Sequence, residues 1–208
     1  INYAVSLQIR GRLVGGYPKN PNVEAAMLKA RGLEDLIPAM VVPTDPVEQE
    51  VAKQAAVEKS WIGFKTNGTG EPILESRNLK AMLKESANIT KSILGVKNLK
   101  AKLAERVFVE PMYIPLGPIS GTDQRVVHAM TMQGPRTSLK KFDYVERPRI
   151  DFYMRVLNDG VITEAMLRTI LEYAQENGLG ADRSQDAGKF DLLLLECVPP
   201  PNVSSAAA

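Results

Sequence analysis

Residues 149–157 read "RIDFYMRVL", and apolar and polar side chains alternate along this stretch. Successive side chains of a β-strand point to opposite faces, so a period of two predicts a strand with one buried face and one solvated face. The apolar positions are Ile150, Phe152, Met154 and Val156, and the polar positions are Arg149, Asp151, Tyr153 and Arg155. The stretch therefore predicts a half-buried strand with a basic outer face.

Three further stretches also predict strands. Residues 3–14, "YAVSLQIRGRLV", alternate in the same way and place Gln8, Arg10 and Arg12 on the polar face. Residues 106–115, "RVFVEPMYIP", are apolar and rich in β-branched side chains, and Pro111 predicts an edge position because proline cannot donate to a strand ladder. Residues 189–198, "KFDLLLLECV", form an apolar run of strand length.

Two longer stretches predict helices. Residues 77–94 have apolar side chains near helical spacing, namely Leu79, Met82, Leu83, Ala87 and Ile93. Residues 163–178 begin at Thr163, a good N-cap, and end at Gly178, a good C-terminal signal. The apolar face of this second helix is expected to comprise Met166, Leu167, Ile170, Leu171 and Ala174.

The order of these elements is strand, helix, strand, strand, helix, strand. This βαββαβ order predicts an α+β, ferredoxin-like core, which is also the topology of RRM domains. In this topology the first and third strands are neighbours at the sheet centre and the helices cover one face. The other face of the sheet is then open for binding.

Two segments interrupt the predicted core. Residues 15–75 contain two short helical patterns, at 21–31 and 47–59, and a short strand pattern at 60–65. Residues 115–148 are polar, basic and rich in Gly and Pro, with a strand-like piece at 125–132. We therefore expect one ferredoxin-like domain over 1–198, a helical insertion at 15–75, a basic insertion at 115–148 and a disordered tail at 199–208.

Composition limits the possible functions. The 208 residues carry a formal net charge of +2, so a polyanion site has to come from local clusters of Lys and Arg. Cys197 is the only cysteine, which excludes a disulfide framework and predicts a buried thiol in a reducing compartment. No apolar stretch approaches the roughly 20 residues of a membrane span, so a cytoplasmic location is expected. No metal-ligand cluster or nucleotide-binding motif is present, so neither a metal nor a cofactor is expected.

The polar sides of the first and third predicted strands form a candidate binding surface. Cations around an aromatic ring on adjacent strands suit phosphates and a stacked base, as in sheets that bind single-stranded RNA. The candidate residues are Gln8, Arg10, Arg12, Arg149, Tyr153 and Arg155. The alternative is that these are ordinary solvated positions or that acidic residues pair with the arginines.

Residues 178–190, "GLGADRSQDAGKF", join the second helix to the last strand. The N–H groups of a glycine-rich turn can point at a phosphate, and Arg183 and Lys189 would add charge beside Gly178 and Gly180. A helix cap followed by a turn would explain the glycines without any ligand.

This loop and the order of elements resemble the RAMP superfamily of CRISPR-associated RNA-binding proteins. The matching residues are Gly178, Gly180, Arg183, Ser184, Gly188 and Phe190. The resemblance implies a ferredoxin-like core, a glycine-rich loop before the final strand, and insertions like those of the family's backbone subunits. The chain departs from the family loop at Asp182, Asp186 and Ala187, and the two acids could pair with Arg183 and make the loop a structural latch.

The basic insertion is a further candidate for RNA binding. It mixes cations with Phe142 and Tyr144, a combination typical of single-strand binding, although a solvated loop with aromatics packed on the core is the alternative. Its candidate residues are Arg125, Arg136, Lys140 and Lys141. His128, the only histidine, is a weak catalytic candidate, together with Tyr144 and Lys140 or Lys141.

These observations favour a non-catalytic subunit that binds single-stranded RNA, such as a guide RNA, largely through its backbone. The expected partners are RNA and either further copies of the chain or other subunits in a filament, with no membrane. A metal-independent endoribonuclease using His128 and a structural or viral self-assembly protein without nucleic acid are the alternatives.

Overall fold

The computed structural model describes residues 1–19, 61–131 and 134–199, with side chains left out at 127–138. The helices expected at 21–31 and 47–59 and the tail expected at 199–208, except for Pro199, lie outside the described residues. The chain divides into two compact units. The first comprises residues 1–13, 66–118 and 145–208, and the second comprises residues 14–65 and 119–144.

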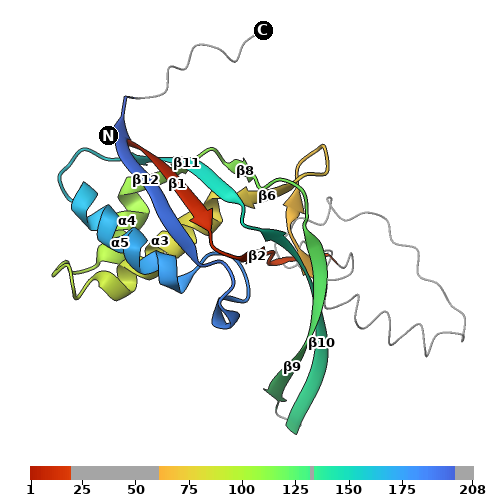
Figure 1. The fold of residues 1–208 in the computed structure, drawn as a ribbon. Coiled ribbons are helices and arrows are strands. Elements are labelled where there is room, and N and C mark those ends of the chain that lie inside the picture. The colour runs from red at the N-terminus through yellow and green to blue at the C-terminus, as the bar shows by residue number, and fades with distance from the viewer. Residues whose placement is uncertain (20–60, 132–133, 200–208) are drawn as a thin grey trace, which may run out of the picture. The chain divides into compact units, whose positions relative to one another are not determined.

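The first unit contains a four-stranded antiparallel sheet with the helices against one face (Figure 1). The strand order is β12-β1-β11-β7, and β1 and β11 are central, as the predicted ferredoxin-like topology requires. The strands are β1 (Asn2–Ile9), β7 (Val107–Glu110), β11 (Arg149–Val156) and β12 (Phe190–Val198). The helices are α3 (Ser76–Thr90), α4 (Leu99–Arg106) and α5 (Glu164–Asn177). The α+β fold class is therefore confirmed.

The alternating pattern of the sequence builds the core of this unit. Strand β11 is strictly alternating, exposed at odd positions and buried at even ones, so its apolar face packs under the helices. The fully buried side chains include Leu7, Ile9, Ile150 and Met154 from the sheet and Leu79, Leu83, Leu167 and Ile170 from the helices. The predicted cap of α5 is confirmed, because Thr163 Oγ1 accepts a hydrogen bond from the Met166 amide at 3.4 Å.

The strand expected over 3–14 is wrong in extent. Strand β1 ends at Ile9, the chain bends at Arg10 and Gly11, and β2 (Arg12–Val14) belongs to another sheet. The Arg10 amide donates to the Lys189 carbonyl at 2.9 Å, and the Gly11 carbonyl accepts from the Arg147 amide at 2.7 Å. Arg10 and Arg12 therefore do not continue the polar face on which Gln8 lies.

Three other expectations need correction. The helix expected over 77–94 ends at Thr90, and Ile93, expected inside, is 73% exposed beyond the helix end. Helix α4 was not expected, because it is only eight residues long and only Leu99 and Leu103 mark its buried side. Cys197 is exposed rather than buried, because it lies at the end of β12, beyond the buried Phe190 and Leu195 of the same strand.

The second sheet is built around a long hairpin. Strand β10 (Gly134–Glu146) pairs antiparallel with β9 (Gly121–Thr131), and the sheet order is β2-β10-β4-β3, with β9 on β10. The other strands are β3 (Tyr17–Pro18) and β4 (Ile62–Gly63). The strand-like piece at 125–132 is confirmed as far as Thr131, whereas the polar residues that follow form a strand instead of the expected loop.

A third, small sheet contains β5 (Lys65–Thr66), β6 (Pro72–Glu75) and β8 (Tyr113–Pro115). Strand β6 leads directly into α3, and its four residues are buried. In the part of the chain that the structure describes, no helix has the length and apolarity that crossing a membrane would require.

Candidate nucleic-acid interface

The strand register places four of the candidate residues on the open face of the first sheet. Gln8 lies opposite Arg149 across the β1–β11 pair, and Tyr153 lies opposite Ala4 further along the same pair. Arg155 follows on the same face because it is two residues from Tyr153. We call Gln8, Arg149, Tyr153 and Arg155 the open-face set.

Tyr153 is the exposed aromatic residue at the centre of this face. It is 45% exposed and lies on β11, an inner strand of the sheet. On the neighbouring edge strand β7, Phe108 lies opposite Arg155, and the guanidinium carbon of Arg155 is 5.1 Å from the centre of the Phe108 ring. Phe108 was not among the candidates, because its neighbours Val107 and Val109 are also apolar and no alternation marks its face. Two aromatic rings and an arginine therefore share this part of the face.

Acidic residues pair with the arginines of the open-face set. Arg149 Nε donates to Asp151 Oδ1 at 3.0 Å, and Arg155 Nη2 lies 3.4 Å from Glu110 Oε1. Burial would raise the pKa of Asp151, but the nearby Ser6 hydroxyl and the hydrogen bond from Arg149 outweigh it and lower that pKa. Both arginine side chains remain 60% exposed. A phosphate could reach them from solvent, but it would compete with a carboxylate.

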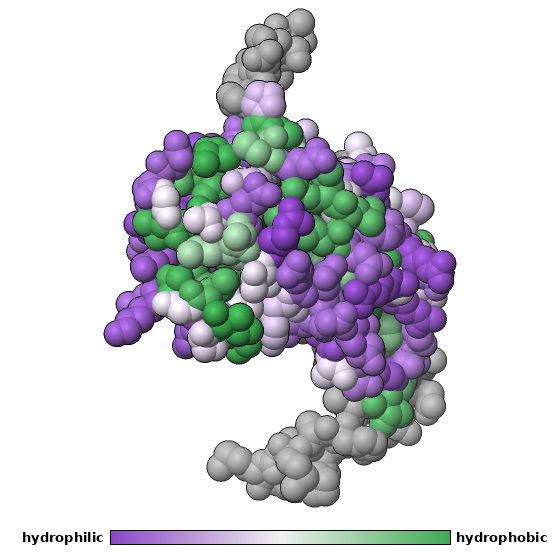
Figure 2. Space-filling view, turned by 60° about the vertical axis from the view of Figure 1, so that its left-hand side comes forward, coloured by the Kyte–Doolittle hydropathy of each residue, from purple (hydrophilic) through white to green (hydrophobic). Residues whose placement is uncertain are grey.

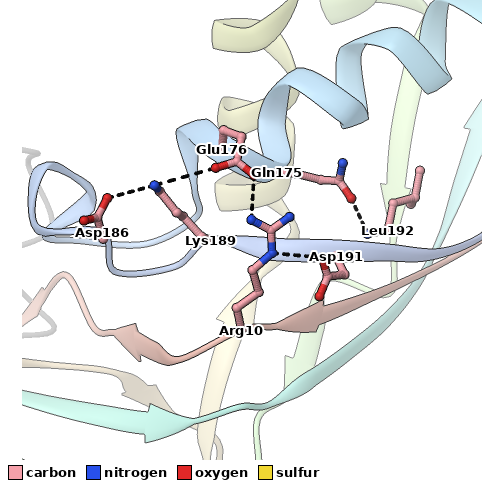
Figure 3. Close-up of polar contacts among 7 residues, drawn as sticks. All are labelled: Arg10, Gln175, Glu176, Asp186, Lys189, Asp191 and Leu192. Atoms are coloured by element: carbon pink, nitrogen blue, oxygen red, sulfur yellow. Dashed lines mark hydrogen bonds and ion pairs between the residues drawn. The ribbon is translucent and has the colours of Figure 1, made fainter.

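Arg10 and Lys189 come together in an ion-pair network beside the glycine-rich loop (Figure 3). Arg10 Nη1 donates to Glu176 at the end of α5 at 2.5 Å, and Arg10 Nε donates to Asp191 at 2.8 Å. Lys189 Nζ lies 2.8 Å from Asp186 and 3.6 Å from Glu176. The hydrogen bond from Arg10 lowers the pKa of Glu176, and the bond to Asp186 raises the pKa of Lys189. Two cations thus face three carboxylates in this network.

The glycine-rich loop closes on itself through its backbone. Gly178 ends α5 with a φ of 77°, and the Leu179 amide donates to the Gly188 carbonyl at 2.9 Å. The Gly188 amide donates to the carbonyl of Arg12 at 2.8 Å, so the loop is also hydrogen-bonded to the segment that follows β1. Gly180 has a φ of 85°, a left-handed conformation that glycine adopts without strain. These contacts are those of a structural loop.

Asp186 does not pair with Arg183, so this part of the expected pairing is wrong. Arg183 Nη1 donates instead to Glu85 of α3 at 2.8 Å, whereas Asp186 pairs with Lys189. The hydrogen bond from Arg183 lowers the pKa of Glu85 against the opposing effect of burial. The loop is therefore latched to α3 by a residue 98 positions away in the sequence.

The hairpin of the second unit positions the basic candidates of the insertion. Lys140 lies opposite Arg125, and Lys141 lies opposite Gln124, so these two lysines point to opposite faces of the ribbon. The ammonium of Lys141 is 3.8 Å from the centre of the Trp61 ring. The backbone of Arg136 lies opposite Ala129, and that of His128 lies opposite Thr137; the side chains of Arg136 and His128 lie outside the described residues.

Asp143 anchors the base of this hairpin. It is 2% exposed and accepts hydrogen bonds from Trp61 Nε1 at 2.9 Å and from Thr122 Oγ1 at 2.8 Å. Lys19 Nζ lies 3.7 Å from its other oxygen. This cluster is a structural anchor of the second unit.

Within the described ranges, no three His, Cys, Asp or Glu residues are grouped so that they could hold a metal ion. Asp151 and Asp186 lie close in sequence to Arg149 and Lys189, whereas sequence reasoning did not identify Glu85, Glu110 or Glu176 as partners of the candidate cations, because these come from distant positions. Only the register and the tertiary packing bring them together.

Similarity to known proteins is found at the level of three-dimensional structure. No protein-family model and no curated protein matches the chain. Among solved structures, the chain is similar to a chain in the cryo-EM structure of the Type III-B Cmr-beta bound to cognate target RNA, with a TM-score of 0.50 and 12% sequence identity. The match covers 94% of this chain and 59% of that chain. At this identity the likeness concerns the fold, and it agrees with the ferredoxin-like order of elements.

Proposed function

We propose that this chain is a non-catalytic subunit that binds single-stranded RNA within a CRISPR-type ribonucleoprotein. Residues 1–198 would form one ferredoxin-like domain with insertions at 15–75 and 115–148. The open sheet face would hold the RNA, and further copies or other subunits would assemble along the same strand.

The exposed ring of Tyr153 on an inner strand is the observation that carries this proposal. RNA-recognition sheets stack bases on aromatic side chains at such positions, while arginines beside them contact phosphates. Arg149 and Arg155 flank Tyr153 on the same face, and both are mostly exposed. The structural likeness to a chain of an RNA-bound Cmr complex supports the same class of ligand.

The direct test is the affinity of Tyr153→Ala for a single-stranded uridine oligomer, measured by fluorescence anisotropy. Stacking of one base on an aromatic side chain is worth about 1–3 kcal/mol, so we expect Kd to rise by about one to two orders of magnitude. Tyr173→Ala is the matched control, because Tyr173 is 37% exposed on helix α5, away from the open face.

An unchanged affinity of Tyr153→Ala would remove the open sheet face from the proposal. Gln8→Ala should weaken binding less, because Gln8 Nε2 already donates to the Arg147 carbonyl at 2.8 Å. Incubation of the purified protein with RNA should leave the RNA uncleaved, and cleavage would favour a nuclease instead.

A further inference from the structure

The largest excess of positive charge lies on helices α3 and α4, outside the candidate residues discussed above. Residues 76–106 contain eight Lys and Arg but only two Glu, whereas the whole chain has a net charge of +2. Both acids are occupied by arginines: Glu85 accepts from Arg183, and Glu105 accepts from Arg106. The positive charge of this segment is therefore not balanced within the segment.

Six of the eight cations in this segment are lysines. They are Lys80, Lys84, Lys91, Lys97, Lys100 and Lys102. In the described part of the chain, none of them forms an ion pair with a carboxylate. On the open sheet face, by contrast, a carboxylate pairs with each arginine. Figure 2, which brings the helix side of Figure 1 forward, shows hydrophilic residues on this side beside exposed hydrophobic ones.

Three of these lysines lie in a line along α3. Successive residues of an α-helix are about 100° apart, so Lys80, Lys84 and Lys91 fall within about 40° of one another. Lys91 keeps helical dihedral angles at the C-cap, so the line runs to the helix end.

Phe108 connects this line to the open sheet face. The Lys80 ammonium lies 5.0 Å from the centre of the Phe108 ring, and the guanidinium carbon of Arg155 lies 5.1 Å from the same centre. Lys80 comes from α3, and Arg155 comes from the open-face set. Two cations therefore lie beside the Phe108 ring on edge strand β7, one from the open-face set and one from the helix.

The chemistry of the line favours a nucleic acid over a protein partner. Protein interfaces have an apolar core and contain few lysines, whereas lysines that track a phosphate backbone need no apolar centre. The exposed Ile89 lies about 140° or more around α3 from Lys84 and Lys80, so it does not provide such a centre.

We propose that a bound RNA strand leaves the open sheet face at β7 and continues along α3, where Lys80, Lys84 and Lys91 contact its phosphates. This inference rests on the proposed function, since it extends the RNA path that begins at Tyr153. The contacts are with the backbone, so they add affinity without sequence preference and are sensitive to salt.

The test compares two uridine oligomers, one of about four nucleotides, which fits the sheet face, and one of about sixteen, which can reach α3. The test variant combines Lys84→Gln and Lys91→Gln. Its control carries Arg at the same two positions, which keeps the charge. For the long oligomer we expect the Gln variant to bind about tenfold more weakly and its salt slope to fall by about 1.4. For the short oligomer we expect no change.

Each outcome separates this inference from the proposed function. If the Gln variant keeps the affinity and salt slope for the long oligomer while Tyr153→Ala loses affinity for both lengths, the helical path is wrong and the sheet-face function stands. If the wild type binds neither oligomer, the proposed function fails as well. If the Gln variant binds RNA normally but loses self-association on a sizing column, the lysines form a protein-docking surface and the inference is overturned.

Discussion

At the scale of single residues, Gly188 is the most constrained position of the glycine-rich loop. Its φ of 75° is unfavourable for a side chain, and a Cβ there would collide with the carbonyl oxygen of Leu179. Its own amide and carbonyl bind Arg12 and Leu179, so the backbone cannot move away without breaking both bonds. The loop therefore needs glycine here for folding, whether or not it contacts a phosphate.

We expect Gly188→Ala to lower the free energy of unfolding by about 3 kcal/mol or more, because strain and collision act together. Gly160→Ala is the control, since Gly160 has a φ of 71° and an added methyl group would meet no atom of the described residues within 4 Å. Only the strain of about 1–2 kcal/mol then remains. Urea denaturation measures the free energy of unfolding of both variants. Equal losses in the two variants would contradict the collision with Leu179.

Asp143 offers a second test at this scale, because the single tryptophan of the chain reports on it. Asp143→Ala removes the acceptor of the Trp61 indole N–H and leaves a buried donor unsatisfied, at a cost of about 1–3 kcal/mol. We expect a lower unfolding midpoint and a shifted Trp61 emission maximum. Asp123→Ala, at an exposed position of β9, is the control and should leave the emission unchanged. An unshifted emission for Asp143→Ala would contradict the hydrogen bond.

At the scale of secondary-structure elements, the sequence predicts what depends on local periodicity. Alternation through residues 149–156 predicts the two faces of β11, and Thr163 and Gly178 predict the ends of α5. Strand β10 was missed, because the hydrogen bonds of a two-stranded ribbon do not require an alternating apolar face. The residues of the candidate site also fall into two groups: local periodicity predicts the face on which some of them lie, whereas tertiary packing alone determines the partners of others.

Gln8 and Tyr153 lie on the face that their alternation predicts, since strand geometry fixes the direction of each side chain. The partner of Arg10 could not be predicted, because Glu176 is 166 positions away and only the packing of α5 beside β12 brings it close. Phe108 was missed because its strand is short and its neighbours are apolar.

The contact between the loop and α3 should depend on pH. The hydrogen bond from Arg183 lowers the pKa of Glu85 below its ordinary value of 4.5, so the folded state binds fewer protons at this site than the unfolded state near that pH. The contact therefore stabilises the fold above about pH 4.5 and loses this effect as the pH falls through the lowered pKa.

We expect Arg183→Gln to be less stable than the wild type at neutral pH, and this difference should shrink as the pH falls below 4.5. Urea denaturation over a pH series measures it. Arg168→Gln is the control, because it breaks an exposed pair with Glu164 at 3.4 Å, which contributes little to stability. A wild-type advantage that stayed constant down to strongly acidic pH would show that the Arg183–Glu85 contact does not act through charge.

At the scale of the whole molecule, the two compact units differ in the core that holds them together. In the described part of the second unit, the buried apolar side chains are Val14, Phe64 and Phe142, whereas the first unit has a continuous core between its sheet and helices. Apolar burial is the main stabilising contribution, so regions with less of it open at lower free energy.

We therefore expect the second unit to unfold first as urea is added. Trp61 lies in the second unit and reports its unfolding by fluorescence, while α3, α4 and α5 lie in the first unit and dominate the far-ultraviolet circular dichroism. The fluorescence transition should have its midpoint at a lower urea concentration than the helical signal, because the two probes follow different cores. Coincident transitions would show that the units unfold cooperatively as one body. In that case the contacts around Asp143 would stabilise the whole chain, and Asp143→Ala would shift both signals together.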